Sequence, residues 1–460
     1  MRRVVQIEAP WREPALALAA LADEPWTLCL LSGGGGVRGR WSYLTARPQE
    51  TLWLEAVGAQ EPFAALAALI PQGDVLAGGP PFQGGMAGLA SYDLGSRAQG
   101  VSLGTHPDWP HLAAGLYPAL LAFDHQDRRL LAIGRGDTGT DARARALDLL
   151  AIIEAGPEHG ARIPPQGLAG PMTASCGDAY EAAVAQVVGQ IAAGEIFQAN
   201  IARRWSGRLA AGARPYDLFA RLAEDSAAPF AAYFRLPHRA VVSNSPERFV
   251  ALRQGPSGLM AETRPIKGTR RRGFDEVEDL ALAAELLASP KDRAENLMIV
   301  DLMRNDLARV CQPGTVKVPE LFAVESFANV HHLVSTVTGV LRPGEGAADL
   351  LRAAFPPGSI TGAPKIQAMK VIASLEPPRG PYCGSIFWAG ADGAFDSSVL
   401  IRTAACVLDR EADGADRWRV EARAGAGLVA DSEPVTERQE TEAKISALLR
   451  ALGANPQGAA

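Results

Sequence analysis

A lysine in a restricted backbone setting is the first residue of this chain that could do chemistry. Lys267 lies in the segment TRPIKGTR (263–270), between Pro265 and Gly268. Four arginines lie within five residues of it: Arg264, Arg270, Arg271 and Arg272. Neighbouring cations disfavour a protonated amine and would leave the lysine nucleophilic. A solvated basic loop is the alternative, and the spacing alone does not exclude it.

A glutamate beside a proline is the second candidate. Glu247 lies in SNSPERF (243–249), between apolar runs that we expect to be strands. A carboxylic acid in such a place can be desolvated enough to act as a proton donor. The alternative is a surface ion pair with Arg248.

Two more glutamates lie in segments with helical character. Glu295 belongs to RAENLM (293–298) and Glu440 to QETEAK (439–444). Carboxylates on rigid elements suit Mg²⁺, which takes few protein ligands and keeps several waters. A lone helical glutamate is ordinarily on the surface, and Lys444 at i+4 from Glu440 is also ordinary helix support.

Two glycine-rich runs invite different interpretations. The run at 33–36 lacks the following Lys-Ser or Lys-Thr of a phosphate-binding loop, so we interpret it as a flexible turn. The run AGAG (424–427) follows a predicted strand, where small residues let a ligand approach the main chain. A tight bend is the alternative for this second run.

Hydrophobic periodicity predicts the elements that carry these residues. Helices are predicted over 178–193, over 275–310 with a break near Ser289-Pro290, and at the C-terminal end, with Ile445, Leu448, Leu449 and Leu452 on one side. Pro364 opens a further helix, whose inner face we expect to be Ile366, Met369 and Ala373. Segments 385–389 and 399–407 are predicted to form a hairpin, and 418–424 another strand. The mixture predicts an α+β fold with antiparallel sheet.

Composition excludes several classes of protein. The 460 residues are 47% hydrophobic and 21% charged, which is globular, and they contain no long uncharged apolar stretch for a membrane span. A formal charge of -6 argues against broad nucleic-acid binding. Five scattered cysteines indicate reduced thiols and a cytoplasmic location, and the N-terminal residues match no signal peptide.

One segment is a candidate boundary between two parts of the chain. Residues 156–171 contain eight Gly or Pro in 16 positions, which predicts a linker. The alternative is a long surface loop within a single fold.

Ten ordered segments resemble the chorismate-utilising enzymes. They run from about residue 175 to 452 and are GEIFQANIARRW (194–205), SNSPERF (243–249), TRPIKGT (263–269), DRAENLMIVDLMRNDLARV (292–310), VHHLVSTVTG (330–339), GSITGAPKIQAM (358–369), YCGSIFW (382–388), LIRTA (400–404), AGAG (424–427) and ERQETEAK (437–444). The resemblance implies a large α+β sandwich of antiparallel sheets flanked by helices. Residues 1–165 would complete the sandwich, and 172–455 would form the chorismate-binding catalytic domain.

Position 267 discriminates between branches of that family. Relatives that make anthranilate read Pro-Ile-Ala-Gly-Thr there, whereas relatives that aminate chorismate at C4 carry the lysine found here. The isochorismate and salicylate branches place a general-base lysine in the segment where this chain has QANI (198–201). The resemblance therefore implies amination of chorismate at C4, in 4-aminobenzoate and folate biosynthesis. An anthranilate-forming large subunit is the alternative.

The resemblance also implies roles for individual residues. Lys267 would be the nucleophile, Glu247 the acid and His332 an active-site histidine, with Mg²⁺ held by Glu295 and Glu440. The implied substrate-binding residues are Gly268, Thr269, Thr361, Tyr382, Arg402, Gly425, Ala426 and Gly427. A tryptophan pocket would be built around Ser32, Arg40, Trp41, Pro229, Phe230 and Ala231.

Ammonia is the remaining reactant. The chain contains no Gly-x-Cys-x-Gly segment with a later His-x-Glu, so we find no glutaminase motif in it. The resemblance implies that a separate glutamine amidotransferase subunit supplies the ammonia.

Overall fold

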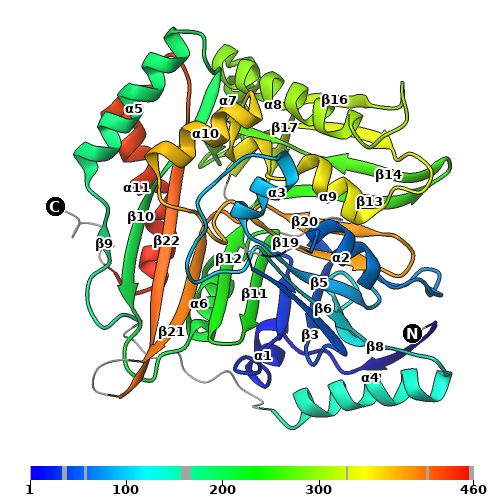
Figure 1. Cartoon of the computed structure of the whole chain (residues 1–460). Helices are drawn as coiled ribbons and strands as arrows, with labels where there is room; N and C mark the ends of the chain where they lie inside the picture. Colours follow the sequence, from blue (N-terminus) through cyan, green and yellow to red (C-terminus); the bar gives the residue numbers. More distant parts are fainter. Residues whose placement is uncertain are drawn as a thin grey trace.

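A computed structural model describes residues 2–33, 39–55, 58, 60–156, 167–327, 330–410 and 414–454. Two large antiparallel sheets form its framework (Figure 1). Within those residues the larger sheet has 12 strands, in the order β1-β8-β7-β3-β2-β11-β12-β21-β22-β10-β18, with β9 paired to β10. The smaller sheet has 10 strands in the described ranges, in the order β15-β17-β14-β13-β20-β19-β5-β6-β4, with β16 paired to β17.

The strands of the larger sheet come from both ends of the chain. They are β1 (Arg3–Ala9), β2 (Leu28–Leu31), β3 (Trp41–Thr45), β7 (Ala119–Asp124), β8 (Arg129–Gly136), β9 (Thr173–Ala174), β10 (Gln198–Arg208), β11 (Phe230–Leu236), β12 (Arg239–Ser245), β18 (Gly362–Ala363), β21 (Thr403–Arg410) and β22 (Asp416–Leu428). Strand β2 pairs with β11, which joins the N-terminal strands to the later ones.

The smaller sheet also combines strands from the N-terminal part of the chain with later ones. Its strands are β4 (Glu50–Leu54), β5 (Gly85–Ala90), β6 (Leu112–Tyr117), β13 (Arg248–Gly255), β14 (Gly258–Thr263), β15 (Ile266–Arg271), β16 (Lys317–Ser326), β17 (Val330–Val340), β19 (Ser385–Gly390) and β20 (Phe395–Ser398). Here β5 pairs with β19. Strands from before residue 165 therefore complete both sheets.

Helices cover the outer faces of the sheets. They are α1 (Pro14–Ala19), α2 (Pro62–Leu69), α3 (Gly95–Gln99), α4 (Gly139–Glu154), α5 (Gly177–Ala192), α6 (Pro215–Ser226), α7 (Glu276–Ala288), α8 (Pro290–Ala308), α9 (Ala347–Ala354), α10 (Lys365–Leu375) and α11 (Pro434–Ala451), with short 3₁₀ turns η2 (Tyr92–Leu94) and η3 (Gly358–Ile360). Helices α5 and α11 lie beside β10 and β22, and α7 and α8 lie near β17 (Figure 1). In the described part of the chain no helix is long and apolar enough to span a membrane.

The two sheets meet face to face through an aromatic core. Tyr43 of β3 lies 6.4 Å from Trp388 of β19 between ring centroids, and Phe82 stacks on Trp388 at 4.9 Å. Offset or tilted aromatic pairs of this kind stabilise beyond the area that they bury. This layer joins the larger sheet to the smaller one and makes the fold a sandwich.

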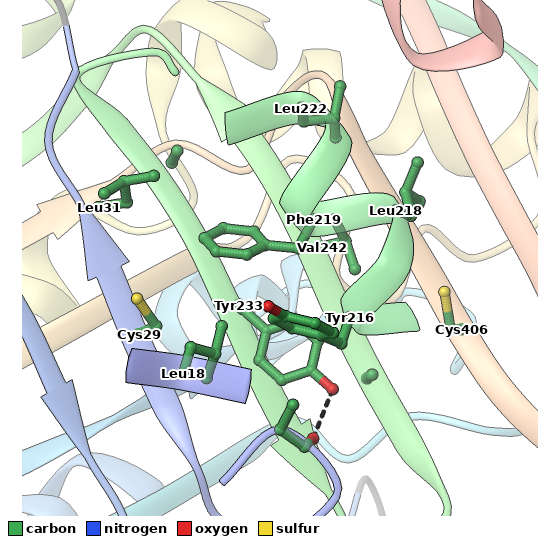
Figure 2. Close-up of a cluster of buried hydrophobic side chains, with 14 of the residues drawn as sticks. Leu18, Cys29, Leu31, Tyr216, Leu218, Phe219, Leu222, Tyr233, Val242 and Cys406 are labelled. Atoms are coloured by element: carbon green, nitrogen blue, oxygen red, sulfur yellow. Dashed lines mark hydrogen bonds between the residues drawn. The ribbon is translucent and has the colours of Figure 1, made fainter. Parts of the chain in front are cut away.

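The outer face of the larger sheet has its own core, between strands and helices. Figure 2 shows Phe219 of α6 and Tyr233 of β11 among buried aliphatic side chains. The Tyr233 hydroxyl donates to the carbonyl of Ala22 at 2.7 Å, which satisfies the polar end of the ring. Burial raises the pKa of Cys29 and Cys406 in this core to about 12 each. All five cysteines are free thiols, as the sparse spacing predicted.

Most of the predicted elements are confirmed. Helix α5 covers the first predicted helix, and α7 and α8 meet at Ser289, whose side chain accepts from the backbone N–H of Asp292. Helix α11 buries Ile445, Leu448 and Leu449 as expected. The predicted α+β sandwich of antiparallel sheets is also confirmed.

Two local predictions are wrong. The inner face of α10 includes Met369 as predicted, but Ile366 is 44% exposed and Ala373 is also exposed. The other buried residues of this helix are Lys365, Ala368, Val371 and Ile372. Lys365 points inward because its amine donates to the buried carboxylate of Asp306 at 2.6 Å. The hairpin partner of β19 is β20, and the predicted strand 399–407 overlaps β21, which pairs with β12 and β22 in the other sheet. Residues 399–402 carry the chain from one sheet to the other, which alternation of apolar residues does not reveal.

The predicted linker lies mainly outside the described residues, since 157–166 are not described. Its last residues run along the larger sheet, where Leu168 bridges to Leu209.

Candidate active site

One cavity of about 450 Å³ collects most of the predicted site residues. It lies where β15 and β17 of the smaller sheet face β10 and β22 of the larger one, with α8 and α11 alongside. Eleven of the predicted residues line it: Lys267, Glu247, His332, Gly268, Thr269, Tyr382, Arg402, Gly425, Gly427, Glu295 and Glu440.

Two predicted substrate-binding residues do not line the cavity. Thr361 is fully buried and donates its hydroxyl to the carbonyl of Pro357 at 2.8 Å. Ala426 packs into a separate apolar cluster, because alternate residues of a strand face opposite sides. Ala424 lines the cavity together with the two glycines of that run.

Lys267 reaches into the cavity from an irregular part of β15. The pairing of β15 with β17 changes register between Ile266 and Thr269, and such a bulge re-aims side chains. Gly268 has φ +81°, and a Cβ there would lie 2.8 Å from side-chain atoms of Leu286 and Asp292. The backbone beside the lysine therefore requires glycine.

The charges around Lys267 differ from the sequence argument. Each of the four neighbouring arginines is paired with a carboxylate: Arg264 with Glu325, Arg270 with Glu285, Arg271 with Glu278, and Arg272 with Asp279. The argument that these four cations leave the lysine nucleophilic therefore loses its basis, because a carboxylate balances each of them. The nearest charged partner of Lys267 is Glu295, with Nζ 3.7 Å from Oε2.

Glu247 is a buried acid that lines the same cavity. It is 7% exposed, and burial raises its pKa to about 7, although a hydrogen bond from Ser359 and the charge of Lys267 oppose the rise. Arg248 turns away and pairs with Asp396 and Glu262. The alternative of a surface ion pair between Glu247 and Arg248 is therefore wrong, since Glu247 is buried and Arg248 pairs with these other carboxylates.

His332 lies on β17 beside the lysine strand. Its Nδ1 is 3.0 Å from the hydroxyl of Thr269. Burial lowers the pKa of His332 to about 4, and the charge of Arg402 acts in the same direction. The ring is therefore neutral at pH 7 and would act as a hydrogen-bonding group there.

Arg402 is a candidate anion ligand. Its backbone lies in the left-handed region at φ 52°, in the segment that crosses between the sheets. Among the described residues its guanidinium forms no hydrogen bond or ion pair. Tyr382 lines the same wall, so the pair can present a charged fork and a hydroxyl to a carboxylate.

Carboxylates suited to a hard cation line the end formed by α8 and α11. Glu295 lies on α8, and Glu437 and Glu440 lie one helical turn apart on α11. In the described ranges no group of three or more His, Cys, Asp or Glu side chains is arranged to hold a metal by itself. Separate carboxylates fit Mg²⁺, which binds one or two of them together with substrate oxygens and water.

The sequence reasoning missed several lining residues. Ser359 donates to Glu247 at 2.7 Å, and Glu437 accepts from Ser432 at 2.6 Å. Asn200 also lines the cavity, and its buried Oδ1 has no hydrogen-bond partner in the part of the chain that the structure describes. Two patterns in the sequence could have indicated some of these residues. Polar residues alternate in QANI (198–201), which includes Asn200, and two acids lie three residues apart in ERQETEAK (437–444), which includes Glu437.

A second cavity of about 210 Å³ lies between the sheets. Five residues of the predicted tryptophan pocket line it: Ser32, Trp41, Pro229, Phe230 and Ala231. Arg40 does not line it, because its guanidinium binds Asp124 with two hydrogen bonds of 2.9 and 2.7 Å.

Comparison with known proteins gives consistent results. The pattern of the family described as chorismate binding enzyme matches residues 35–450. Aminodeoxychorismate synthase component 1 of Klebsiella aerogenes is 39% identical over 97% of this chain and 98% of its own length. Anthranilate synthase component 1 of Streptomyces coelicolor is also 39% identical, over 91% of this chain and 81% of its own. The crystal structure of anthranilate synthase component I from Streptococcus pneumoniae superposes with a TM-score of 0.76 at 26% identity, covering 90% of this chain and 93% of that one.

Proposed function

Because this chain belongs to the chorismate binding enzyme family, we propose that it aminates chorismate at C4 to give 4-amino-4-deoxychorismate. The relative from Klebsiella aerogenes is named aminodeoxychorismate synthase component 1, although an anthranilate synthase component 1 is equally identical to this chain. The proposal therefore depends on the site rather than on overall similarity.

The single observation that carries the proposal is the presence of Lys267 in the cavity. Its Nζ lies 3.7 Å from Glu295, and Glu247 lines the same cavity. A lysine amine, which is a nucleophile once it has lost its proton, and a buried carboxylic acid on one cavity are the two groups needed to displace a poor leaving group in two steps.

The proposed chemistry uses these two residues in turn. The Lys267 amine forms a bond to C2 of chorismate, the ring electrons shift, and the C4–O bond breaks. Glu247 gives its proton to the departing hydroxyl, which leaves as water. Ammonia then bonds to C4, the electrons shift back, the C2–N bond to Lys267 breaks, and a proton returns to Glu247.

The remaining lining residues would bind the substrate. Arg402 and Tyr382 would hold a carboxylate of chorismate. The main chain at Gly425 and Gly427 would contact the chorismate ring. His332, neutral at pH 7, would donate or accept a hydrogen bond. Gly268 and Thr269 complete this wall.

Mg²⁺ is the proposed cofactor. Glu295 and Glu440 would hold it, with Glu437 close by on the same helix as Glu440. When bound, the cation would neutralise a substrate carboxylate and withdraw electrons from the ring.

A partner protein would use glutamine to supply the ammonia. The relatives are named component 1, which implies a second component, and we propose that it is a glutamine amidotransferase that releases ammonia. We further propose a role in 4-aminobenzoate and folate biosynthesis, and a cytoplasmic location.

Product analysis tests the proposal. The purified chain is incubated with chorismate, Mg²⁺ and either an ammonium salt or glutamine, and the products are identified by mass and chromatography. We expect a C4-aminated product with ammonium and no turnover with glutamine alone. Anthranilate with release of pyruvate would instead support the alternative function, and turnover with glutamine alone would contradict the need for a partner.

The cavity around Trp41 stays a candidate tryptophan pocket. Its lining supports this proposal, because aromatic side chains such as Phe230 and Trp388 line the cavity together with the polar Ser32, Arg248 and Asp396. Isothermal titration with tryptophan, compared for the native chain and Trp41→Ala, tests it, and absence of binding to the native chain would refute it.

A further inference from the structure

A hydrogen bond singles out one oxygen of the proposed proton donor. The hydroxyl of Ser359 donates to Oε1 of Glu247 at 2.7 Å, and both residues are buried, at 8% and 7% exposure. Among the described residues this hydroxyl has no other acceptor, and Oε2 of Glu247 has no protein donor. The two carboxyl oxygens therefore lie in different surroundings.

That asymmetry decides where the proton of a neutral Glu247 lies. A carboxylic acid carries its proton on one oxygen and accepts hydrogen bonds on the other. With Ser359 donating to Oε1, the proton belongs on Oε2. A proton on Oε1 would instead face the serine hydroxyl and leave that hydroxyl without an acceptor.

The turn that carries Ser359 is held from several sides. A Cβ at Gly358 would lie 2.5 Å from Leu302 of α8, so the turn packs closely on that helix. Arg379 donates to the carbonyl of Ile360 at 3.1 Å. Just beyond the turn, the buried Lys365 pairs with Asp306 at 2.6 Å. Ser359 is therefore presented by a rigid support, as a precise hydrogen bond requires.

We propose that Ser359 is a positioning residue that holds the transferable proton of Glu247 on Oε2 and stabilises the carboxylate left after the proton has gone. The inference rests on the proposed function for its role in turnover, but the hydrogen bond and its effect on Glu247 exist without substrate. A hydroxyl donates a stronger hydrogen bond to a carboxylate than to a neutral acid, so Ser359 favours proton release.

Other charges act on the same carboxyl group. Lys267 from β15, Arg402 from the crossing segment and Lys444 from α11 all lower the pKa of Glu247, while burial raises it to about 7. The hydrogen bond from Ser359 also lowers this pKa. Removing the hydroxyl should therefore move the titration of Glu247 to higher pH.

The test is an infrared titration of the full chain without substrate. The carboxyl C=O band that disappears in Glu247→Gln identifies Glu247, and its intensity is followed from pH 4 to 10. We expect a native midpoint near 7 and, in Ser359→Ala, a rise of about one pH unit, the size expected for a hydrogen bond to a charged group. Ser359→Thr keeps a hydroxyl and should restore the native midpoint.

Ser243→Ala is the matched control, because it also removes a buried hydroxyl. That hydroxyl forms a hydrogen bond of 2.8 Å with Thr403, and neither residue lines the cavity. It should leave the midpoint unchanged. An unchanged midpoint in Ser359→Ala would overturn the proposal. If Ser359→Ala does not fold, Ser359→Cys replaces it, since a thiol is a weaker donor and should shift the midpoint in the same direction.

Turnover gives a second measurement. With ammonium as the nitrogen source, Ser359→Ala should lower kcat about tenfold and leave the KM for chorismate nearly unchanged. A rise in KM with native kcat would mean that Ser359 binds substrate instead. A native chain that forms no aminated product would refute the proposed function, whereas the infrared titration would still decide the role of Ser359.

Discussion

Replacing Glu247 by glutamine should stabilise the protein while it abolishes the proposed activity. Burial raises the pKa of Glu247 from 4.5 to about 7. The native state therefore binds the proton more tightly than the unfolded chain does. By linkage this group opposes folding increasingly as the pH rises from 4.5 through 7.

The size of the effect follows from the two pKa values. At pH 8 the ionised carboxylate destabilises the native state by about 3 kcal/mol, taking about 1.36 kcal/mol for each pH unit between them. At pH 4, where both states are mainly protonated, the effect is close to zero. Glutamine has nearly the same shape, stays neutral and still accepts from Ser359, so Glu247→Gln should recover this free energy at pH 8 only.

Thermal unfolding at pH 4 and pH 8 measures this difference. For a chain of this length, about 3 kcal/mol corresponds to a rise in Tm of about 3 °C. Glu154→Gln, at the exposed end of α4, removes the same charge without burial and should leave Tm nearly unchanged at both pH values. Equal shifts of Tm at pH 4 and pH 8 in Glu247→Gln, or none at pH 8, would refute the argument that the buried carboxylate destabilises the folded protein when it is ionised.

Three further predictions concern the cavity. Lys267→Ala should lose the covalent adduct of mass chorismate less water that the native chain forms without ammonia, and most amination with it; peptide mass mapping checks this, and native-rate amination without any adduct would contradict it. Glu295→Gln and Glu440→Gln should each raise the Mg²⁺ concentration needed for half-maximal rate by tenfold or more, because each removes an anionic ligand, and unchanged Mg²⁺ dependence in both would exclude the assignment. Gly425→Ala should weaken chorismate binding, because its Cβ would lie 2.5 Å from Oδ1 of Asn200; equal KM values for the variant and the native chain would show that this wall is not used.

Much of the local structure could be predicted from patterns in the chain. The helix break at Ser289-Pro290 was predicted because proline cannot continue a helix, and the serine side chain caps the next one. The inner face of α10 could not be predicted, because the lysine that it buries is paired with Asp306, which lies 59 residues earlier in the sequence. The passage of the chain between the two sheets at 399–402 could not be predicted either. The segments before and after it are both apolar, and a run of apolar residues does not show to which sheet a strand belongs.

The sequence by itself determined which residue types stand in which segments: a lysine between proline and glycine, a glutamate after proline, and acids on two helices. These local facts, with the ordered segments, were sufficient to indicate the family, which the family pattern over residues 35–450 confirms, whereas the branch remains the proposal tested by product analysis. Only the tertiary structure decided which of these groups meet and in what state. Pairing of each arginine with a carboxylate neutralises the charges expected around Lys267, and burial beside Ser359 makes Glu247 an acid with a pKa near neutrality. Both effects depend on contacts between residues far apart in the chain, and desolvation and pairing are properties of a folded environment rather than of a segment.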